Sequence, residues 1–275
     1  MSGKRIRLDV FLTENGFSES REKARRDILS GWVKVNGETV REAAKAINGS
    51  ESITVQRPQG LFVSRGGDKL RKGLDAFELN MSGLITVDLG ASTGGFTDCL
   101  LKAGAIKVYA IDVGYGQLDF SLRQDERVIV MERTNVRELV AAQFPEKPNF
   151  ITADLSFISV IKILPKLTEL FCPAKGVMLI KPQFEAHPGE HKKGVVRKKE
   201  VHTAILKRTL EDLRENGLSI LGLTYSPIKG PAGNIEFLLY FAIQEQTVDS
   251  IIGLRSEEIT TLVEQIVEEA HATLS

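Results

Sequence analysis

The chain has 275 residues, of which 42% are hydrophobic and 26% are charged. This composition is typical of a globular protein with one large or two unequal domains. Lys plus Arg equals Asp plus Glu at 36 each, so the net charge alone favours no class of partner. The two cysteines, Cys99 and Cys172, lie far apart, which excludes a disulfide framework and gives no support for a zinc site.

The sequence shows no targeting or membrane segment. The basic residues near the start are not followed by an apolar run, so a secretory signal peptide is not expected. No stretch approaches the roughly 18 apolar residues that are needed to cross a bilayer. We therefore expect a cytoplasmic protein that does not associate with membranes.

Two short helices followed by small strands are predicted within the first sixty residues. Leu8 and Leu12 share one helical face, and residues 20–29 have the pattern of a second amphipathic helix. The pattern then changes to alternation over residues 33–35, and Asn36-Gly37 is a strong turn signal. These elements predict a compact α+β module.

This module carries an excess of positive charge, with 11 Lys and Arg against 8 Asp and Glu in residues 1–60. Cations near a helix start can neutralise phosphates, which supplies most sequence-independent affinity for nucleic acid. A solvated helix face would show a similar charge pattern. The candidate RNA-binding residues are Arg5, Arg7, Arg21, Lys23, Arg25, Arg26, Lys34 and, beyond the module, Arg65.

The run RLDVFLTENGFSESREKARRDILSGWVKVNGETV, residues 7–40, resembles the RNA-binding S4 domain. The likeness depends on the Ser-Arg-x-x-Ala run and the Val-x-Val-Asn-Gly turn. It implies a module that binds structured RNA and performs no chemistry. We assign residues 1–58 to this domain, 59–63 to a linker and 64–275 to a second domain, because Pro and Gly interrupt both periods in this region.

The second domain contains a strand, a Gly-rich turn and a helix in immediate succession. An apolar run ends near Asp88, and Gly90-Ala-Ser-Thr-Gly-Gly-Phe follows it. Glycines let the backbone approach a nucleotide-like ligand closely. The next predicted strand ends with Asp112, about 20 residues further on, where a carboxylate commonly accepts hydrogen bonds from ribose hydroxyls.

The Gly-rich turn favours one cofactor over another. It reads Gly-x-Ser-x-Gly-Gly and lacks the second glycine that lets the backbone of dinucleotide enzymes meet a pyrophosphate. S-adenosylmethionine has no pyrophosphate, so the turn favours a methyltransferase. An NAD or NADP oxidoreductase is the rival, and a Gly-rich turn that binds no ligand is the remaining alternative. The candidate cofactor-binding residues are Asp88, Gly90, Ser92, Thr93, Gly94, Gly95, Phe96, Asp112, Asn135 and Val136.

Further apolar runs alternate with helical patterns along the rest of the chain. They predict an α/β, Rossmann-like fold of the class I methyltransferase type, with a seven-stranded, mostly parallel sheet. Residues 199–216 and 255–272 have the pattern of amphipathic helices. We expect the last of these to pack on its own chain, and the protein to be a monomer. The additional predicted strands are residues 127–131, 150–154, 176–181, 218–225 and 235–243.

Three polar residues stand at the ends of these strands. Asp154 and Lys181 end two strands, and Glu236 begins the last one. All three converge at the ligand-binding edge if the last strand runs antiparallel. Asp154 could instead cap a helix, and Lys181 could be a solvated strand end. Glu236 within an apolar strand requires a cationic partner, and Lys181 is the candidate.

Six motifs make the chain resemble the FtsJ-like ribose 2′-O-methyltransferases and, within them, the TlyA or hemolysin A family: FVSRGGDKL, DLGASTGGFTD, ERTNVR, ADLSFIS, LIKPQFE and GNIEF. The resemblance implies methyl transfer from S-adenosylmethionine to a ribose 2′-hydroxyl of an rRNA cytidine. The implied partners are rRNA or ribosomal subunits, small, large or both. It places a catalytic tetrad on Lys69, Asp154, Lys181 and Glu236.

The resemblance leaves the roles within the tetrad partly open. Lys181 is expected either to remove the proton of the hydroxyl as a base or to stabilise the developing alkoxide as a cation. Asp154 and Glu236 would orient Lys181, and Lys69 would position the RNA or the hydroxyl.

Two further readings of the chain are a non-enzymatic protein of ribosome assembly and a pore-forming hemolysin. The lack of a membrane-inserting helix argues against the hemolysin. His187 and His191 lie four residues apart, but no acidic or cysteine partner follows at a recognised spacing, so we expect no metal. The basic loop around them, residues 187–199, is interpreted as an RNA-contacting lid, with a plain solvated loop as the alternative.

Overall fold

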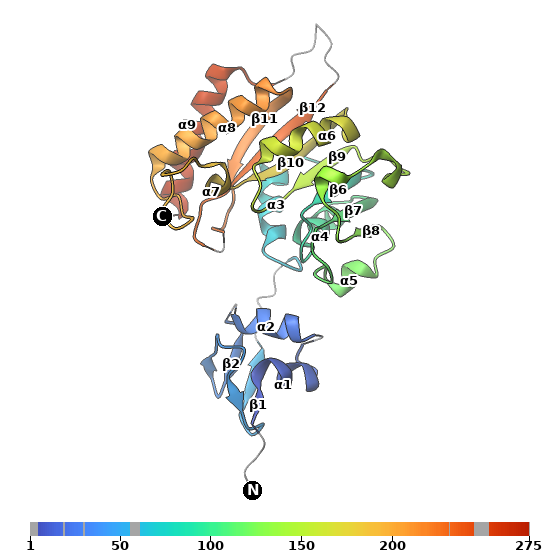
Figure 1. Cartoon of the computed structure of the whole chain (residues 1–275), viewed down its shortest axis with the longest axis vertical. Helices are drawn as coiled ribbons and strands as arrows, with labels where there is room; N and C mark the ends of the chain where they lie inside the picture. Colours follow the sequence, from blue (N-terminus) through green and yellow to red (C-terminus); the bar gives the residue numbers. More distant parts are fainter. Residues whose placement is uncertain are drawn as a thin grey trace. The chain divides into compact units, whose positions relative to one another are not determined.

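The computed structural model describes residues 5–18, 20–29, 31–55, 61–230, 232–244 and 253–274. The chain divides into two compact units, Met1–Gly60 and Leu61–Ser275, and each is considered by itself (Figure 1). The predicted linker, residues 59–63, falls partly outside the described residues. Its limits and those of the two domains stay a prediction.

The first unit packs two helices against short strands. Its core contains Leu8 and Leu12 from the first helix and Ala24 and Ile28 from the second, all without solvent exposure. The predicted turn at Asn36-Gly37 joins two of the strands, and both residues have a positive φ, 52° and 85°. The elements are β1 (Ile6–Arg7), α1 (Leu8–Glu14), α2 (Arg21–Leu29), β2 (Val33–Val35), β3 (Glu38–Thr39), β4 (Ala46–Ile47) and β5 (Ile53–Val55). Strand β1 pairs with β4, and β2 lies between β3 and β5.

The second unit is built on a seven-stranded sheet with the order β11-β12-β10-β9-β6-β7-β8. Its strands are β6 (Ile85–Leu89), β7 (Lys107–Ile111), β8 (Val128–Met131), β9 (Phe150–Ala153), β10 (Ala174–Ile180), β11 (Leu218–Tyr225) and β12 (Phe237–Ile243). Strand β12 runs antiparallel to both of its neighbours, β10 and β11, and the pairs among β6, β7, β8, β9 and β10 are parallel. The predicted fold class is therefore confirmed.

Helices cover both faces of this sheet, because alternate residues of a buried strand face opposite layers. In β10, Val177 and Leu179 pack with α3 (Gly66–Ala76), α4 (Gly95–Lys102) and the region of α5 (Phe120–Arg123). Met178 and Ile180 pack in the opposite layer. That layer includes α6 (Leu164–Phe171), α8 (Lys199–Glu215) and α9 (Ser256–Leu274). The short elements are α7 (Pro182–Glu185) and the 3-10 turns η1 (Val136–Glu138), η2 (Ala141–Gln143) and η3 (Val160–Ile163).

Helix α9 packs on its own chain, as the sequence predicts. Its residues Ile259, Val263 and Val267 are buried, and α9 lies along α8 and β11 (Figure 1). Two ion pairs, Lys199–Glu268 and Lys207–Glu264, join its outer side to α8. No helix in the described part of the chain is long and apolar enough to span a membrane.

Candidate active site

The carboxyl ends of the central strands place the predicted tetrad at one edge of the sheet. Asp154 follows β9 directly, and Lys181 follows β10. Glu236 directly precedes β12, and the antiparallel direction of β12 brings its start to the same edge. Lys69 reaches this edge from the first turn of α3. The structure thus brings all four residues together from four separate elements.

The four residues form two ion pairs. Lys69 Nζ lies 2.5 Å from Glu236 Oε2, and Lys181 Nζ lies 2.6 Å from Asp154 Oδ1. The predicted pairing of Glu236 with Lys181 is therefore wrong, although the expectation that Glu236 has a cationic partner is confirmed. Helix α3 presents a cation to Glu236, and strand periodicity contains no information about how that helix packs.

A hydroxyl and an aromatic ring complete the surroundings of Lys181. Its Nζ donates a hydrogen bond to Ser156 Oγ at 2.8 Å and lies 5.9 Å from the centre of the Phe184 ring. Ser156 belongs to the loop after β9, which also carries Phe157. Phe157 has a positive φ of 65°, and 92% of its surface is exposed. An aromatic residue held in the left-handed region and exposed to solvent is rare in a loop of purely structural function.

The Gly-rich turn after β6 requires its glycines. Gly90 has a φ of 84°, and a Cβ there would lie 2.6 Å from the backbone oxygen of Asp154. Ser92 also has a positive φ, 47°, and its N–H donates to Asp112 Oδ2 at 2.8 Å. The other oxygen of Asp112 accepts from the N–H of Gly114 at 2.7 Å. The turn and the end of β7 are therefore held together by one carboxylate.

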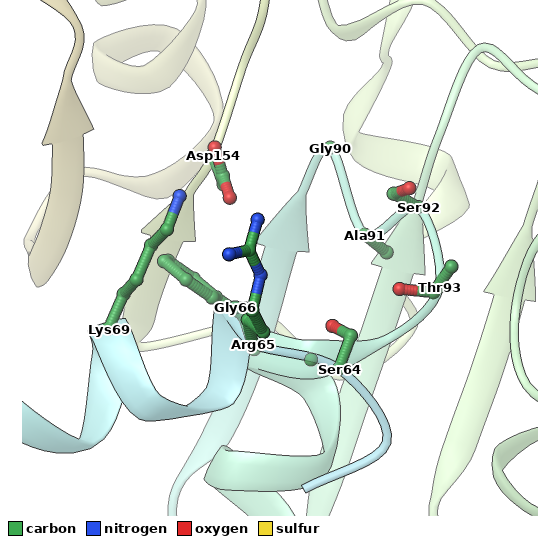
Figure 2. A pocket seen from close by; sticks show the side chains of 11 residues that line it. Ser64, Arg65, Gly66, Lys69, Gly90, Ala91, Ser92, Thr93 and Asp154 are labelled. Carbon is green, nitrogen blue, oxygen red and sulfur yellow. The ribbon is translucent and has the colours of Figure 1, made fainter. Parts of the chain in front are cut away.

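Two adjoining cavities open at this edge, of about 570 Å³ and about 220 Å³. They share Gly90, Ser92 and Asp154. The predicted residues that line the larger one are Gly90, Ser92, Asp112, Asn135, Val136 and Asp154. Those that line the smaller one are Arg65, Lys69, Gly90, Ser92, Thr93, Gly95, Phe96 and Asp154 (Figure 2).

Four of the predicted catalytic and cofactor-binding residues line neither cavity: Asp88, Gly94, Lys181 and Glu236. Asp88 is fully buried below the turn, where its carboxylate accepts hydrogen bonds from Thr97 Oγ1 at 2.7 Å and Thr152 Oγ1 at 3.0 Å. Burial raises the pKa of Asp88 to about 7. Asp88 is thus placed to support the turn from beneath rather than to touch a ligand. Gly94 immediately precedes α4 and has a φ of 93°.

The larger cavity suits the adenosine part of S-adenosylmethionine. Apolar side chains such as Ile111, Val136 and Leu155 line it and can pack against an adenine ring. Both oxygens of Asp112 accept a backbone N–H, but each carboxylate oxygen has two lone pairs, so ribose hydroxyls can still donate to them. Asp154 lines both cavities and would supply negative charge for the positively charged sulfonium of a bound cofactor.

The predicted RNA-binding residues of the first unit differ in solvent exposure, and two of them form ion pairs with the same carboxylate. Arg7 and Arg21 both bond Asp9, whose pKa falls to about 2 mainly because of the hydrogen bond from Arg7. Arg5 and Arg25 are exposed, and Lys23 and Lys34 are partly exposed. The side chain of Arg26 lies outside the described residues. The RNA-binding function of all of them stays a prediction.

The basic loop that the sequence singled out is tied to the segment that precedes Glu236. Asn234 is buried, its Oδ1 accepts from Val196 N–H at 2.9 Å, and its Nδ2 donates to the carbonyl of Gly194 at 2.9 Å. The loop is thus anchored at residues 194–196. Its contact with RNA stays a prediction.

Among the cavity-lining residues that the sequence did not single out, three stand out because they lie beside the tetrad residues in the chain. Ser64 lines the smaller cavity, and Ser156 and Phe157 line the larger one. All three lie inside motifs used for the family resemblance, FVSRGGDKL and ADLSFIS. Their closeness in sequence to Lys69 and Asp154 within those motifs could have identified them as site residues.

Comparisons with known proteins agree with this geometry. The FtsJ-like methyltransferase family matches residues 62–243, and the S4 domain matches residues 6–53. YqxC of Bacillus subtilis is 46% identical over 100% of this chain and 97% of its own length. The 16S/23S rRNA (cytidine-2′-O)-methyltransferase TlyA of Mycobacterium tuberculosis is 38% identical over 91% of this chain and 95% of its own.

A solved structure from Streptococcus thermophilus, described as a hemolysin, shares 38% identity. It covers 98% of this chain and 96% of its own, with a TM-score of 0.75. The family match favours the methyltransferase reading of the Gly-rich turn over the rival oxidoreductase. With its S4 domain, its tetrad residues at one sheet edge and its relatives along almost the whole length, the chain belongs to the FtsJ-like methyltransferase family, in the branch that contains TlyA and hemolysin A.

Proposed function

We propose that this protein transfers a methyl group from S-adenosylmethionine to the 2′-hydroxyl of a cytidine ribose in rRNA. The observation that carries the proposal is the tetrad: two Lys–carboxylate pairs, Lys69–Glu236 and Lys181–Asp154, stand beside the Gly-rich turn at the ligand-binding edge. The name of the Mycobacterium tuberculosis relative, TlyA, gives the same reaction on 16S and 23S rRNA.

The cofactor supplies a methyl group on a sulfonium, which needs no covalent enzyme intermediate. The residues of the chain must hold the ribose oxygen in line with that methyl, at roughly 3–3.5 Å, and deal with the proton of the hydroxyl. The oxygen–methyl bond forms as the methyl–sulfur bond breaks, and the proton passes to a base or to solvent. S-adenosylhomocysteine remains.

Lys181 is the residue that acts on the hydroxyl. Its amine is held by Asp154 and Ser156, so its direction is set before RNA arrives. As a neutral amine Lys181 takes the proton, and as an ammonium it stabilises the developing alkoxide. Both roles require the amine to lie next to the ribose oxygen, and both are lost in Lys181→Ala.

The other members of the tetrad have positioning roles. Asp154 orients Lys181 and borders both cavities. Glu236 fixes Lys69, which lines the smaller cavity and positions the ribose or its phosphate. The first unit, with its exposed cations, holds the folded RNA through phosphate contacts. The working protein is a cytoplasmic monomer that acts on rRNA or ribosomal subunits.

Methyl transfer to isolated ribosomal subunits tests the proposal. Purified protein is incubated with radiolabelled S-adenosylmethionine and subunits or rRNA from a cell that lacks the gene, with Lys181→Ala alongside. Label at one linkage that resists alkali, absent with the variant, is the expected result. Label in a base, or label that persists with Lys181→Ala, would contradict 2′-O-methylation by this tetrad. No label in any subunit, despite cofactor binding, would contradict rRNA as the substrate.

A further inference from the structure

The smaller cavity contains a cation that the reaction described above does not use. Two cationic side chains line it, Lys69 and Arg65 (Figure 2). Lys69 Nζ forms an ion pair with Glu236 Oε2 at 2.5 Å. Arg65 has no ion pair within the part of the chain that the structure describes, and it is exposed. A guanidinium with five N–H donors therefore lies at the cavity with its charge available.

The backbone that carries Arg65 is anchored on both sides. Before it, Phe62 is buried, and the N–H of Val63 donates to Asp98 Oδ2 of α4 at 2.9 Å. After it, the N–H of Gly67 donates to the carbonyl of Ser64 at 3.0 Å. A Cβ at Gly67 would come within 2.2 Å of the Phe62 ring, so glycine is needed to close this turn. Arg65 thus starts from a fixed position.

The same segment lies directly against the Gly-rich turn. A Cβ at Gly95 would lie 2.8 Å from the backbone nitrogen of Gly67 and 3.0 Å from Gly66 Cα. The first residues of α3 and α4 therefore touch, backbone to backbone. Figure 2 shows Arg65 and Lys69 extending from the start of α3 in the direction of Asp154. Arg65 is held next to the turn that the cofactor must contact.

The two cavities differ in what they can bind. The larger one has Asp112 for ribose hydroxyls and an apolar lining for adenine, so it accounts for the nucleoside half of S-adenosylmethionine. The amino-acid half must then extend into the smaller one, because the two cavities share Gly90, Ser92 and Asp154. That half carries the single anionic group of the cofactor, a carboxylate, which needs a donor partner when it leaves water.

We propose that Arg65 binds the carboxylate of the amino-acid end of S-adenosylmethionine, with the Ser64 hydroxyl beside it. The planar guanidinium matches a carboxylate in a two-pronged geometry that lysine cannot reproduce. The sequence had placed Arg65 among the RNA-binding residues. The position of Arg65 next to Gly95, and its charge without an ion pair among the described residues, support binding of the cofactor instead. The inference rests on the proposed function, because it assumes this cofactor.

The binding of cofactor fragments distinguishes the two roles of Arg65, as a contact to the cofactor or as a contact to RNA. Binding of S-adenosylmethionine, S-adenosylhomocysteine and 5′-methylthioadenosine to the full chain is measured by calorimetry. The last of these lacks the amino-acid half. With Arg65→Gln, affinity for the two complete ligands should fall roughly 10-fold or more, and affinity for 5′-methylthioadenosine should stay within about twofold. Arg65→Lys should lie in between.

Arg71→Gln is the matched control. Arg71 lies on the same helix, α3, and pairs with Asp75 at 3.5 Å on the surface, so its loss should leave all three affinities unchanged. Thermal unfolding of each variant checks the fold, and Arg65→Lys keeps the charge if Arg65→Gln proves unstable.

Two results would overturn the inference while leaving the proposed function in place. In one, Arg65→Gln weakens 5′-methylthioadenosine as much as the complete ligands, which would mean that Arg65 only shapes the cavity. In the other, cofactor affinity is unchanged and the KM for RNA rises, which would make Arg65 an RNA contact. If the unmodified protein bound no S-adenosylmethionine, the proposed function and the inference would fail together.

Discussion

The two ion pairs of the tetrad have the same chemistry but opposite access to the cavities. In the Lys69–Glu236 pair the side chains are 9% and 1% exposed, and Glu236 lines neither cavity. In the Lys181–Asp154 pair they are 9% and 22% exposed, and Asp154 borders both cavities. We call Lys69–Glu236 the closed pair, because its carboxylate is buried and lines neither cavity. We call Lys181–Asp154 the open pair, because its carboxylate borders both cavities.

This difference in access indicates different roles for the two ion pairs. Breaking a closed pair leaves a buried charge without compensation, so such a pair holds elements together at a large cost when one partner is removed. An open pair can exchange a partner for substrate without leaving a charge stranded. The pair Lys69–Glu236 therefore ties α3 to the start of β12, and Lys181–Asp154 is available for chemistry.

The largest expected effect is on the open pair. Lys181→Ala should lower kcat/KM for methyl transfer roughly 100- to 10,000-fold, the usual contribution of a group that handles a proton. Affinity for S-adenosylmethionine should change less than about twofold, because Lys181 lines neither cavity. Steady-state methylation and calorimetry measure the two quantities. Lys175→Ala, at the exposed start of the same strand, is the control. If Lys181→Ala were as active as Lys175→Ala, Lys181 would not be the residue that acts on the hydroxyl.

For the closed pair, the main effect should be on stability. Glu236→Ala leaves the ammonium of Lys69 buried alone and should lower the free energy of unfolding by about 3–5 kcal/mol. Urea unfolding followed by circular dichroism measures it. Glu268→Ala breaks the surface pair with Lys199 and should lower the free energy of unfolding far less, because water screens an exposed pair. If the free energy of unfolding fell equally in the two variants, the closed pair would not stabilise the contact between α3 and β12.

Asp88, a buried carboxylate with hydroxyl partners and no ion pair among the described residues, extends the comparison. Burial raises the pKa of Asp88 to about 7 from 3.8, so ionisation is disfavoured in the folded state. Its contribution to stability is complete below pH 3.8 and is lost as the pH rises through about 7. Asp88→Asn should make the free energy of unfolding depend less on pH in this range, by at most about 4 kcal/mol. Parallel urea titrations of both proteins test this, and identical pH profiles would refute it.

The smallest expected effect concerns the hydroxyl beside the open pair. Ser156→Ala removes one acceptor from Lys181 and should slow methyl transfer about 2- to 10-fold, with less than about 1 kcal/mol lost in stability. Ser159 lies in the same loop, but its hydroxyl donates to Glu185. Ser159→Ala should therefore leave the rate unchanged. If Ser159→Ala slowed the reaction as much as Ser156→Ala, the loop as a whole, and not the bond to Lys181, would matter.

Much of this site could be predicted because it lies where apolar strands end. Asp154, Lys181 and Glu236 each interrupt a period of buried residues, and parallel strands bring such ends to one edge. The same local pattern predicted the Gly-rich turn and Asp112. Element type follows from periodicity within a few residues of sequence, so the strands and long helices were predicted well.

What could not be predicted depends on contacts between distant segments. The partner of Glu236 is Lys69 because α3 packs near β12, and no local pattern encodes that packing. Arg65 reaches the smaller cavity because Gly67 and Gly95 allow two helices to touch. From the sequence alone, Arg65 was one more cation near a basic module.

The closed pair also has a consequence for how the protein is made. Lys69 and Glu236 lie 167 residues apart in the chain, and β12 is inserted between β10 and β11. During synthesis the Gly-rich turn and Asp112 leave the ribosome long before Glu236 does, so a partly made chain has the cofactor turn without a completed catalytic edge. The cofactor turn and the catalytic edge are thus completed at different times, because Glu236 reaches Lys69 only after β12 has been synthesised and inserted.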